Sequence, residues 1–549
     1  MEKRLLLAAT LSFLVLYIWS FSVRKPQQNP VSETQKEIEL NNNQAVGEKD
    51  GMDPKMSNEL QGIKERVDET IADITQSVYS EEFTSISNSK VELKFSNKGG
   101  LLKSILIKTY HNSFPITNAL GLDGYDDKIF TLVENQDLRL KYVLETDALR
   151  ITKTYELDPD DYTARMNIVL ENRTGLDKAL DITINNYTID GADVDLKGKE
   201  GNARDISLNE YLVITEEKSY RKNNAHKFSN KNLEKGDGRV NLVGFRDRYF
   251  CALFKPDFET SGFVIDPISE KKLRIQTRID GVQLKAGEVY NIPFTSFFGP
   301  EDLNLLQSYQ QGFEKSKKFY RFGLLDAIAK IIYGLLHFIH KFIPNWGINI
   351  IIISAIIYFS MYPLTAKGMA SMRRMQAMQP KVQELKDKYS KNPEKLNKEL
   401  MQLYKDNKVN PVAGCLPFFF QMPVFIGLYQ VLWRDVAFKG AGFLWIKDLS
   451  EPDQLFSWGA QLPFLGQHFN ILPFVMMIIM FFQQKINQKN VVLTDPAQIQ
   501  QQKMMATVMP VFLGVIFYKF ASGLTLYFTM FYLFSTFTQW KMSKKTEVV

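Results

Sequence analysis

The polar side chains that could do chemistry in the apolar half of this chain are amides and hydroxyls. No Asp or Glu interrupts its long apolar segments, and Lys519 stands at the end of one of them. Pumps and ion-coupled carriers usually place ionisable groups inside the bilayer, so this pattern argues against them. The uncharged groups would wet a cavity if they face inward, or join helices if they face one another, and the residues alone favour neither interpretation. They are Ser354, Tyr358, Gln421, Gln430, Gln483, Gln484, Thr507, Thr525, Thr529, Thr536 and Thr538.

The residue types that hold metals or act as nucleophiles are few and scattered. Cys251 and Cys415 lie in different halves of the chain, which disfavours a disulfide framework and a cysteine metal site. His337 and His340 face nearly the same way on a predicted helix, but two histidines without a third ligand are usually part of a polar face. We therefore expect no metal, no cofactor and no catalytic residues.

The elements that position these groups follow from where the apolar residues are concentrated. Of 549 residues, 45% are hydrophobic, and the net charge of +6 gives no strong sign of a nucleic-acid partner. Residues 26–320 are mixed and polar, whereas 324–540 consist mainly of apolar runs. A bilayer core needs about 20 apolar residues per helix. Six candidate spans result, at about 5–22, 348–366, 412–433, 469–484, 504–520 and 524–540.

Loop charge predicts the orientation of these spans. Residues 367–408 carry 11 Lys/Arg against 5 Asp/Glu, whereas residues 434–467 carry 3 against 4. Basic loops stay in the cytoplasm, so both termini and the 367–408 loop are predicted there and residues 23–347 outside. The first span has a second interpretation as a cleaved signal peptide, because residues 20–22 form a small-x-small site.

The predicted outer part has a tether and a β-sandwich. Residues 26–84 are rich in Gln, Asn, Glu and Lys and are expected to be solvated. From 85 to 305 the runs VELKF, LRLKYVL, ARMNIVLEN, LDITINNYTI, RVNLVGF and LRIQTRI alternate apolar and polar residues, which predicts a large antiparallel sandwich. It shows no catalytic constellation, and a structural or docking role is favoured over a carbohydrate enzyme or binder.

Two further helical elements lie outside the predicted bilayer core. Over residues 324–343, one polar stripe predicts an amphipathic helix on the outer membrane surface. The pattern of the basic loop predicts two helices, 367–389 and 394–408, joined by a short turn into a hairpin. The stripe consists of Asp326, Lys330, Gly334, His337 and Lys341, and the hairpin seam of Met372, Met375, Val382, Leu385, Leu396, Leu400 and Leu403.

Several stretches between residues 320 and 540 resemble one family in its own order. The stretch NPVAGCLPFFFQMPVF is similar to the signature of the YidC insertases, which include the mitochondrial Oxa and chloroplast Albino proteins. The other matching stretches are NWGINIIIISAIIYFSMYPLT, MRRMQAMQPKVQELKDKY, FLWIKDLSEPD, MFFQQK, QKMMATVMPVFLGVIF and SGLTLYF, and the outer domain resembles the Gram-negative type through NKGGLLKSILI and FFGPEDL.

This resemblance implies a membrane protein insertase and chaperone that uses no cofactor. Five spans would enclose a hydrophilic groove open to the cytoplasm and to lipid, and the partners implied are nascent membrane proteins, the Sec translocon, the ribosome with the signal-recognition targeting machinery, and anionic lipids. The groove residues implied are Tyr358, Gln421, Gln430, Gln484, Thr525 and Tyr527; the groove mouth and hairpin residues are Lys367, Met372, Arg373, Arg374 and Met375; and the helix-breaking residues are Pro411, Gly414, Cys415, Pro417 and Pro423.

The chain departs from the resemblance at Tyr358, where the family usually has an arginine five residues before the proline of MYPLT. A tyrosine donates a hydrogen bond but attracts no anion. We expect polar side chains and water to suffice, with Lys367 supplying attraction at the entrance. The competing function is a small-solute transporter or channel. The predicted divisions are 1–25 first span, 26–84 tether, 85–305 sandwich, 320–346 interfacial helix, 347–366 second span, 367–410 hairpin, 411–434 third span, 435–468 outer loop, 469–540 last three spans and 541–549 tail.

Overall fold

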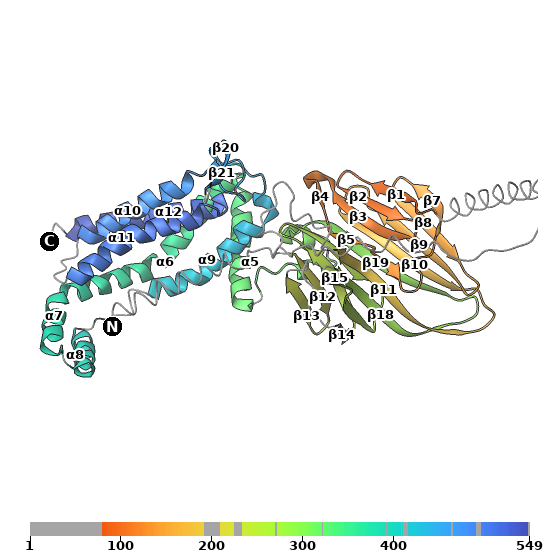
Figure 1. Cartoon of the computed structure of the whole chain (residues 1–549), viewed down its shortest axis with the longest axis horizontal. Helices are drawn as coiled ribbons and strands as arrows, with labels where there is room; N and C mark the ends of the chain where they lie inside the picture. Colours follow the sequence, from red (N-terminus) through yellow and green to blue (C-terminus); the bar gives the residue numbers. More distant parts are fainter. Residues whose placement is uncertain are drawn as a thin grey trace, which may run out of the picture. The chain divides into compact units, whose positions relative to one another are not determined.

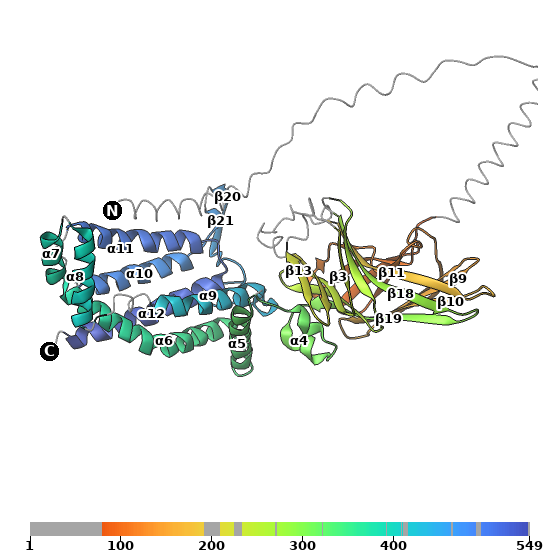
Figure 2. The same ribbon diagram turned by 90° about the horizontal axis from the view of Figure 1, so that it is seen from below.

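The chain has a β-sandwich followed by a bundle of helices, as predicted (Figures 1 and 2). The computed structural model describes residues 80–190, 209–223, 233–269, 272–320, 322–390, 392–407, 409, 416–462, 465–489 and 496–546. The predicted first span and nearly all of the tether lie outside these residues. The tether was predicted two residues too long, because the first strand, β1 (Phe83–Ser87), begins before residue 85.

The sandwich is built from a nine-stranded and a six-stranded sheet, with a smaller four-stranded sheet beside them. The strand order is β13-β12-β15-β16-β19-β10-β9-β8-β7 in the first and β14-β17-β18-β11-β5 in the second, where β6 also pairs with β11. The third sheet has the order β1-β2-β3-β4. The remaining strands are β2 (Val91–Ser96), β3 (Leu101–Ile107), β4 (Asn112–Ser113), β5 (Ile116–Thr117), β6 (Gly121–Leu122), β7 (Thr131–Gln136), β8 (Arg139–Glu145), β9 (Leu149–Leu157), β10 (Thr163–Asn172), β11 (Lys178–Asp190), β12 (Glu210–Thr215), β13 (Ser219–Asn223), β14 (Glu234–Asp237), β15 (Val240–Arg246), β16 (Phe250–Pro256), β17 (Gly262–Pro267), β18 (Lys272–Leu284) and β19 (Val289–Pro300).

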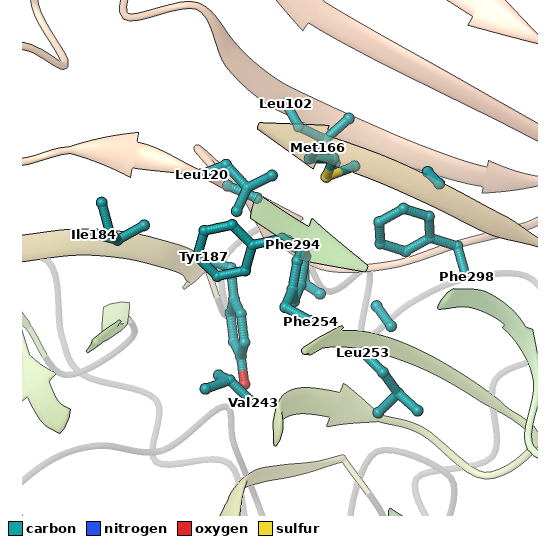
Figure 3. Packing of buried hydrophobic residues seen from close by; sticks show 14 of the residues in the cluster. Leu102, Leu120, Met166, Ile184, Tyr187, Val243, Leu253, Phe254, Phe294 and Phe298 are labelled. Carbon is teal, nitrogen blue, oxygen red and sulfur yellow. The ribbon is translucent and has the colours of Figure 1, made fainter. Parts of the chain in front are cut away.

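The sheets form because alternate side chains enter a shared core. Along β9 every second residue is buried, and β10, its antiparallel neighbour, repeats the pattern so that Ile151 lies opposite Leu170. The central strand β16 is buried on nearly every residue, as expected for a strand covered on both faces. Aromatic side chains such as Tyr187, Phe254 and Phe294 fill the core between the sheets (Figure 3). All six alternating runs identified in the sequence form strands.

A buried ionic network closes the end of the sandwich from which the chain leaves toward the helices. The Arg246 guanidinium donates to the carboxylates of Glu210 and Glu301, the latter at 2.7 Å, and both Arg246 and Glu301 are almost fully buried. Lys317 donates to the main-chain oxygen of Glu301. Because buried charges are costly unless they are paired, these residues hold the exit segment against β12, β15 and β19.

Strand β9 carries a fully buried lysine. Lys153 has no exposed surface, and its Nζ donates to the carbonyl oxygens of Gly99 at 2.7 Å and Leu120 at 2.8 Å. Burial lowers the pKa of Lys153 to about 8, against the opposing attraction of Asp126. Its two hydrogen bonds satisfy carbonyl groups that would otherwise be buried without donors.

The helical half contains a long helix at each of the last five predicted spans. Helix α12 (Ser522–Thr546) contacts α6 (Trp346–Ala377), α9 (Leu416–Arg434) and α10 (Leu472–Lys489), and α11 (Pro496–Phe517) packs against α10. Helix α5 (Gly323–His340) packs on α9 and α6, while a short hairpin, β20 (Phe456–Leu462) with β21 (Gly466–Phe469), lies between α9 and α10 in the chain. By length and composition, α5 and residues 346–371 of α6 could each cross a membrane.

The basic hairpin begins later than predicted. Helix α6 continues without a break to Ala377, so its last turns include the residues assigned to the first hairpin helix. The hairpin itself consists of α7 (Gln379–Lys388) and α8 (Pro393–Asp406), which contact each other. The break falls at Met378, because Pro380 lacks the N–H group that would continue the hydrogen bonding of α6.

The polar stripe of α5 faces the protein only in part: Asp326 and His337 contact it, whereas Gly334 and Lys341 are exposed. Asp326 is buried and accepts the N–H groups of Phe319 and Tyr320, and it pairs with Lys330 at 2.9 Å. His337 contacts Asp435, which follows α9. The exposed side of the helix is apolar and carries Leu324, Ile331 and Phe338. Docking contacts therefore account for the positions of Asp326 and His337, and the opposite side of the helix is apolar and exposed.

Candidate functional site

The position expected to carry a groove arginine is a buried tyrosine. Tyr358 on α6 is 3% exposed, and its hydroxyl group is hydrogen-bonded to Thr538 of α12. Its ring packs against Phe531, with ring centres 5.4 Å apart, and against Phe534. The hydroxyl is therefore satisfied by a neutral partner in aromatic surroundings, where a charged side chain would require water or a counter-ion.

A second polar contact joins α9 to α12. Gln421 Nε2 donates to the hydroxyl group of Tyr527 at 2.9 Å, and Tyr527 has no exposed surface. The structure therefore brings together two of the predicted groove residues. Thr525 is also buried, but its hydroxyl group bonds back to the Ala521 carbonyl of its own helix.

Gln430 lies apart from this contact. Its Nε2 is 3.5 Å from the hydroxyl group of Tyr320, in the segment before α5, and nine residues of α9 separate it from Gln421. Nine residues correspond to about 13 Å along a helix. Among the described residues, Gln430 Oε1 is buried without a hydrogen-bond partner.

The third polar contact uses residues that were absent from the predicted site. Ser535 Oγ on α12 accepts hydrogen bonds from Gln483 Nε2 of α10 at 2.7 Å and from Gln539 Nε2 at 3.1 Å. The predicted residue on α10 was Gln484, which is half-buried. The sequence signal was the adjacent pair of glutamines, but only the rotation of α10 against α12 decides which of the two meets Ser535.

These contacts place neutral polar groups on α12 and on the faces of the three helices that meet it. Tyr358 of α6, Gln421 of α9 and Gln483 of α10 each bond to a hydroxyl group of α12. Such bonds join helices, which is one of the two interpretations that the sequence left open. Side-chain hydrogen bonds between membrane helices contribute only about 0.6 kcal/mol on average, so each is readily exchanged for another polar partner.

The predicted groove-mouth residues lie around the end of α6 that leads to the hairpin. Lys367 and Arg374 are exposed, and Met375 is half-buried. The side chains of Met372 and Arg373 lie outside the described residues. The structure thus shows accessible positive charge on the last turns of α6 and on α7, the helix that follows.

The helix-breaking motif is described only in part. Pro411, Gly414 and Cys415 lie outside the described residues, and Pro417 is the second residue of α9. Proline in the first helical turn is tolerated because the N–H groups there have no helical partner. Pro423 lies inside α9, which continues through it, so one main-chain hydrogen bond is missing near Gln421.

Comparison with known proteins gives matches in both halves of the chain. A family model described as 60Kd inner membrane protein matches residues 338–548, and one described as YidC periplasmic domain matches residues 124–335. A membrane protein insertase YidC from Chlorobium luteolum is 30% identical over 496 residues, which cover 84% of this chain and 82% of the relative. The chain belongs to the YidC membrane protein insertase family.

Other members and structures are similar to this chain. A YidC insertase from Chlorobaculum tepidum is also 30% identical, over 84% of this chain and 82% of its own length. An active YidC insertase crystal structure is 18% identical over 84% of this chain and 92% of that chain, with a TM-score of 0.36. A galactose mutarotase related enzyme from Lactobacillus acidophilus covers 40% of this chain and 97% of its own, with 10% identity and a TM-score of 0.30, which carries no argument about sugar chemistry.

Family membership identifies each half of the chain with a known part of YidC proteins. The sandwich corresponds to the YidC periplasmic domain and the helical half to the inner-membrane part, which agrees with the division expected from composition. It favours the insertase interpretation over the transporter, and YidC is a family of insertases and not of enzymes.

Proposed function

We propose that this chain inserts newly made membrane proteins into the inner membrane and assists their folding, through the polar faces of α6, α9, α10 and α12. Its membership of the YidC family is the observation that carries this proposal. The neutral hydrogen bonds at α12 support the route, because they offer partners to a client's polar groups where lipid offers none.

Polar partners within the helices would help a client because unpaired polar groups are costly in hydrocarbon. An amide-like group without a partner costs roughly 2–7 kcal/mol to transfer into an apolar medium. A client backbone that exchanges bonds with Tyr358, Gln421 or Ser535 avoids part of this cost. Gln539 Oε1, which is buried without a partner among the described residues, is an acceptor already available to a client N–H group. Because each exchanged bond is weak, release into lipid remains easy.

We further propose the membrane arrangement that loop charge predicts. Helices α6, α9, α10, α11 and α12 and the N-terminal segment form six spans, with α5 on the periplasmic surface and both termini in the cytoplasm. The exposed basic residues on α6 and α7 then face anionic lipid, the ribosome and targeting factors, and the Sec translocon is a lateral partner. The exposed apolar stripe of α5 supports its contact with lipid.

The experiment that tests the function is insertion into Sec-free liposomes containing the purified chain. Protease protection of a small client with an acidic outer segment is compared with empty liposomes and with a client whose outer segment is neutral. We expect insertion of both clients. Failure with both would refute Sec-independent insertion, and insertion of the neutral client alone would show that the missing groove arginine limits the client range.

Two variants test the polar route and the entrance separately. Gln483→Leu removes the bond to Ser535 and should slow insertion several-fold, whereas Gln484→Leu, one residue along α10, is the matched control. Lys367→Ala should slow only the acidic client, with Lys381→Ala on α7 as its control, since both lysines are exposed. Equal rates for Lys367→Ala and the unmodified chain would contradict the proposed role of this lysine.

A further inference from the structure

Three side chains that can bind metal meet where the sandwich exit, α5 and the end of α9 come together. Asp302 precedes the short helix α4 (Leu303–Ser308), His337 lies in the last turns of α5, and Asp435 follows α9. Each offers one ligand atom, and these atoms all lie within 4.8 Å of one another. We propose that this cluster is a binding site for a divalent transition-metal ion, with zinc as the preferred ion.

The ligand set and spacing fit zinc. Zinc accepts imidazole nitrogen at about 2.0–2.1 Å and carboxylate oxygen at about 2.0–2.2 Å, with three protein ligands and one water in open sites. Calcium and magnesium prefer oxygen ligands alone. Tetrahedral ligands at these distances lie about 3.4 Å apart, and His337 Nε2 is already 2.8 Å from Asp435 Oδ2. A small outward movement admits the ion, and the partial exposure of His337 leaves room for a water ligand.

Neighbouring groups already fix the orientation of each ligand. Main-chain N–H groups hold one oxygen of Asp302 at 2.8 Å and one oxygen of Asp435 at 3.1 Å, which leaves the second oxygen of each carboxylate toward the cluster. The Tyr333 hydroxyl group donates to Asp302 Oδ2 at 3.0 Å. The side-chain amide of Asn304 is 3.4 Å from His337 Nδ1, and with its oxygen turned to that nitrogen it would leave Nε2 for the metal.

The charge of the cluster also favours a cation. Two carboxylates and one imidazole are net negative whether or not the imidazole is protonated, and Asp435 has no exposed surface on which water could screen it. A divalent ion neutralises the cluster. Because the ligands come from three separate segments, a bound ion would tie the sandwich exit to α5 and α9.

His340, one turn further along α5, is not part of the site and provides a control. Its ring stacks on Trp346, with ring centres 3.7 Å apart and planes at 6°, and its Nδ1 is 2.9 Å from the amide of Asn349. The sequence could not separate the two histidines, because the aspartates that distinguish them lie 35 residues before and 98 residues after His337.

The test is zinc titration of the full chain in detergent after chelation, carried on an affinity tag without histidine. Calorimetry should give one saturable equivalent per chain, and Co²⁺ should give the visible absorption of a tetrahedral site. His337→Gln and Asp302→Asn should each weaken zinc binding at least tenfold, whereas His340→Gln should not. Asp302→Asn retains an oxygen that can accept the Leu305 N–H group, so we expect this variant to fold. Circular dichroism would verify its fold.

A second measurement follows the predicted consequence for the junction. Zinc should slow proteolytic cleavage of the segment between residues 309 and 322 at least tenfold in the unmodified chain and in His340→Gln, but not in His337→Gln. Absence of a one-equivalent isotherm would overturn the proposal. Unchanged binding in the folded ligand variants would do the same, because it would indicate adventitious binding elsewhere.

Discussion

Replacing Glu301 by glutamine should destabilise the exit end of the sandwich. Glu301 is 1% exposed and accepts a hydrogen bond from Arg246 at 2.7 Å, and the other carboxylate that neutralises Arg246 is Glu210. Glu210 also lies 3.7 Å from Arg221. Without the Glu301 charge, the buried guanidinium group of Arg246 and the partly exposed one of Arg221 share one carboxylate.

The expected loss follows from the cost of an unpaired buried charge. Removing one partner of a buried ion pair costs about 3–5 kcal/mol, and because glutamine keeps one acceptor we expect a value near 3 kcal/mol. Glu145→Gln is the matched control, since Glu145 and Arg150 form a pair at 3.4 Å on the sandwich surface, with 64% and 41% of their side chains exposed. A surface pair of this kind contributes less than about 1 kcal/mol.

Urea-dependent proteolysis of the full chain in detergent measures both free energies of unfolding, and pH adds a second test. Burial alone would raise the pKa of Glu301, but the charges of Arg246 and Lys317 outweigh it and lower the pKa below the ordinary 4.5. The stabilising contribution is therefore complete above pH 4.5 and is lost as pH falls through the lowered value. The difference between unmodified chain and Glu301→Gln should shrink in acid. A loss no greater than that of Glu145→Gln would refute the reasoning.

Three further substitutions have defined outcomes. A Cβ at Gly514 would overlap the Met477 sulfur on α10, so Gly514→Leu should cost about 1–3 kcal/mol and lower the melting temperature. Gly334→Leu, which faces open space, should not. Lys153 has a pKa of about 8 against an ordinary 10.5, so the unfolded chain binds more protons between these values. Stability should rise with pH across this window by up to about 1.4 kcal/mol per unit, and urea titrations of Lys153→Met should lack the rise. The Tyr187 hydroxyl group donates at 2.6 Å to the buried carbonyl of Gly244, so Tyr187→Phe should lower the free energy of unfolding by about 1–3 kcal/mol. Urea titration should show this as a lower midpoint with an unchanged slope.

Local patterns predicted the strands and most helices because each is a periodic property of neighbouring residues. The alternation in β9 and β10 marks two half-buried strands whatever their partners. The hairpin boundary was missed because residues 367–377 continue the period of the preceding helix, and only Pro380 marks the break. The polar stripe of α5 was identified from its spacing, but spacing does not specify whether a stripe meets water or protein.

The sequence by itself determined the family, the division into sandwich and membrane helices, and the neutral character of the polar groups in the spans. Which of these groups meet was decided only by the tertiary structure. Gln483 and Gln484 are chemically identical, and the packing of α10 on α12 selects the first. Likewise, His337 rather than His340 joins Asp302 and Asp435. Such contacts depend on how each helix is rotated and how deeply it packs, and this packing is determined jointly by residues that lie far apart in the chain.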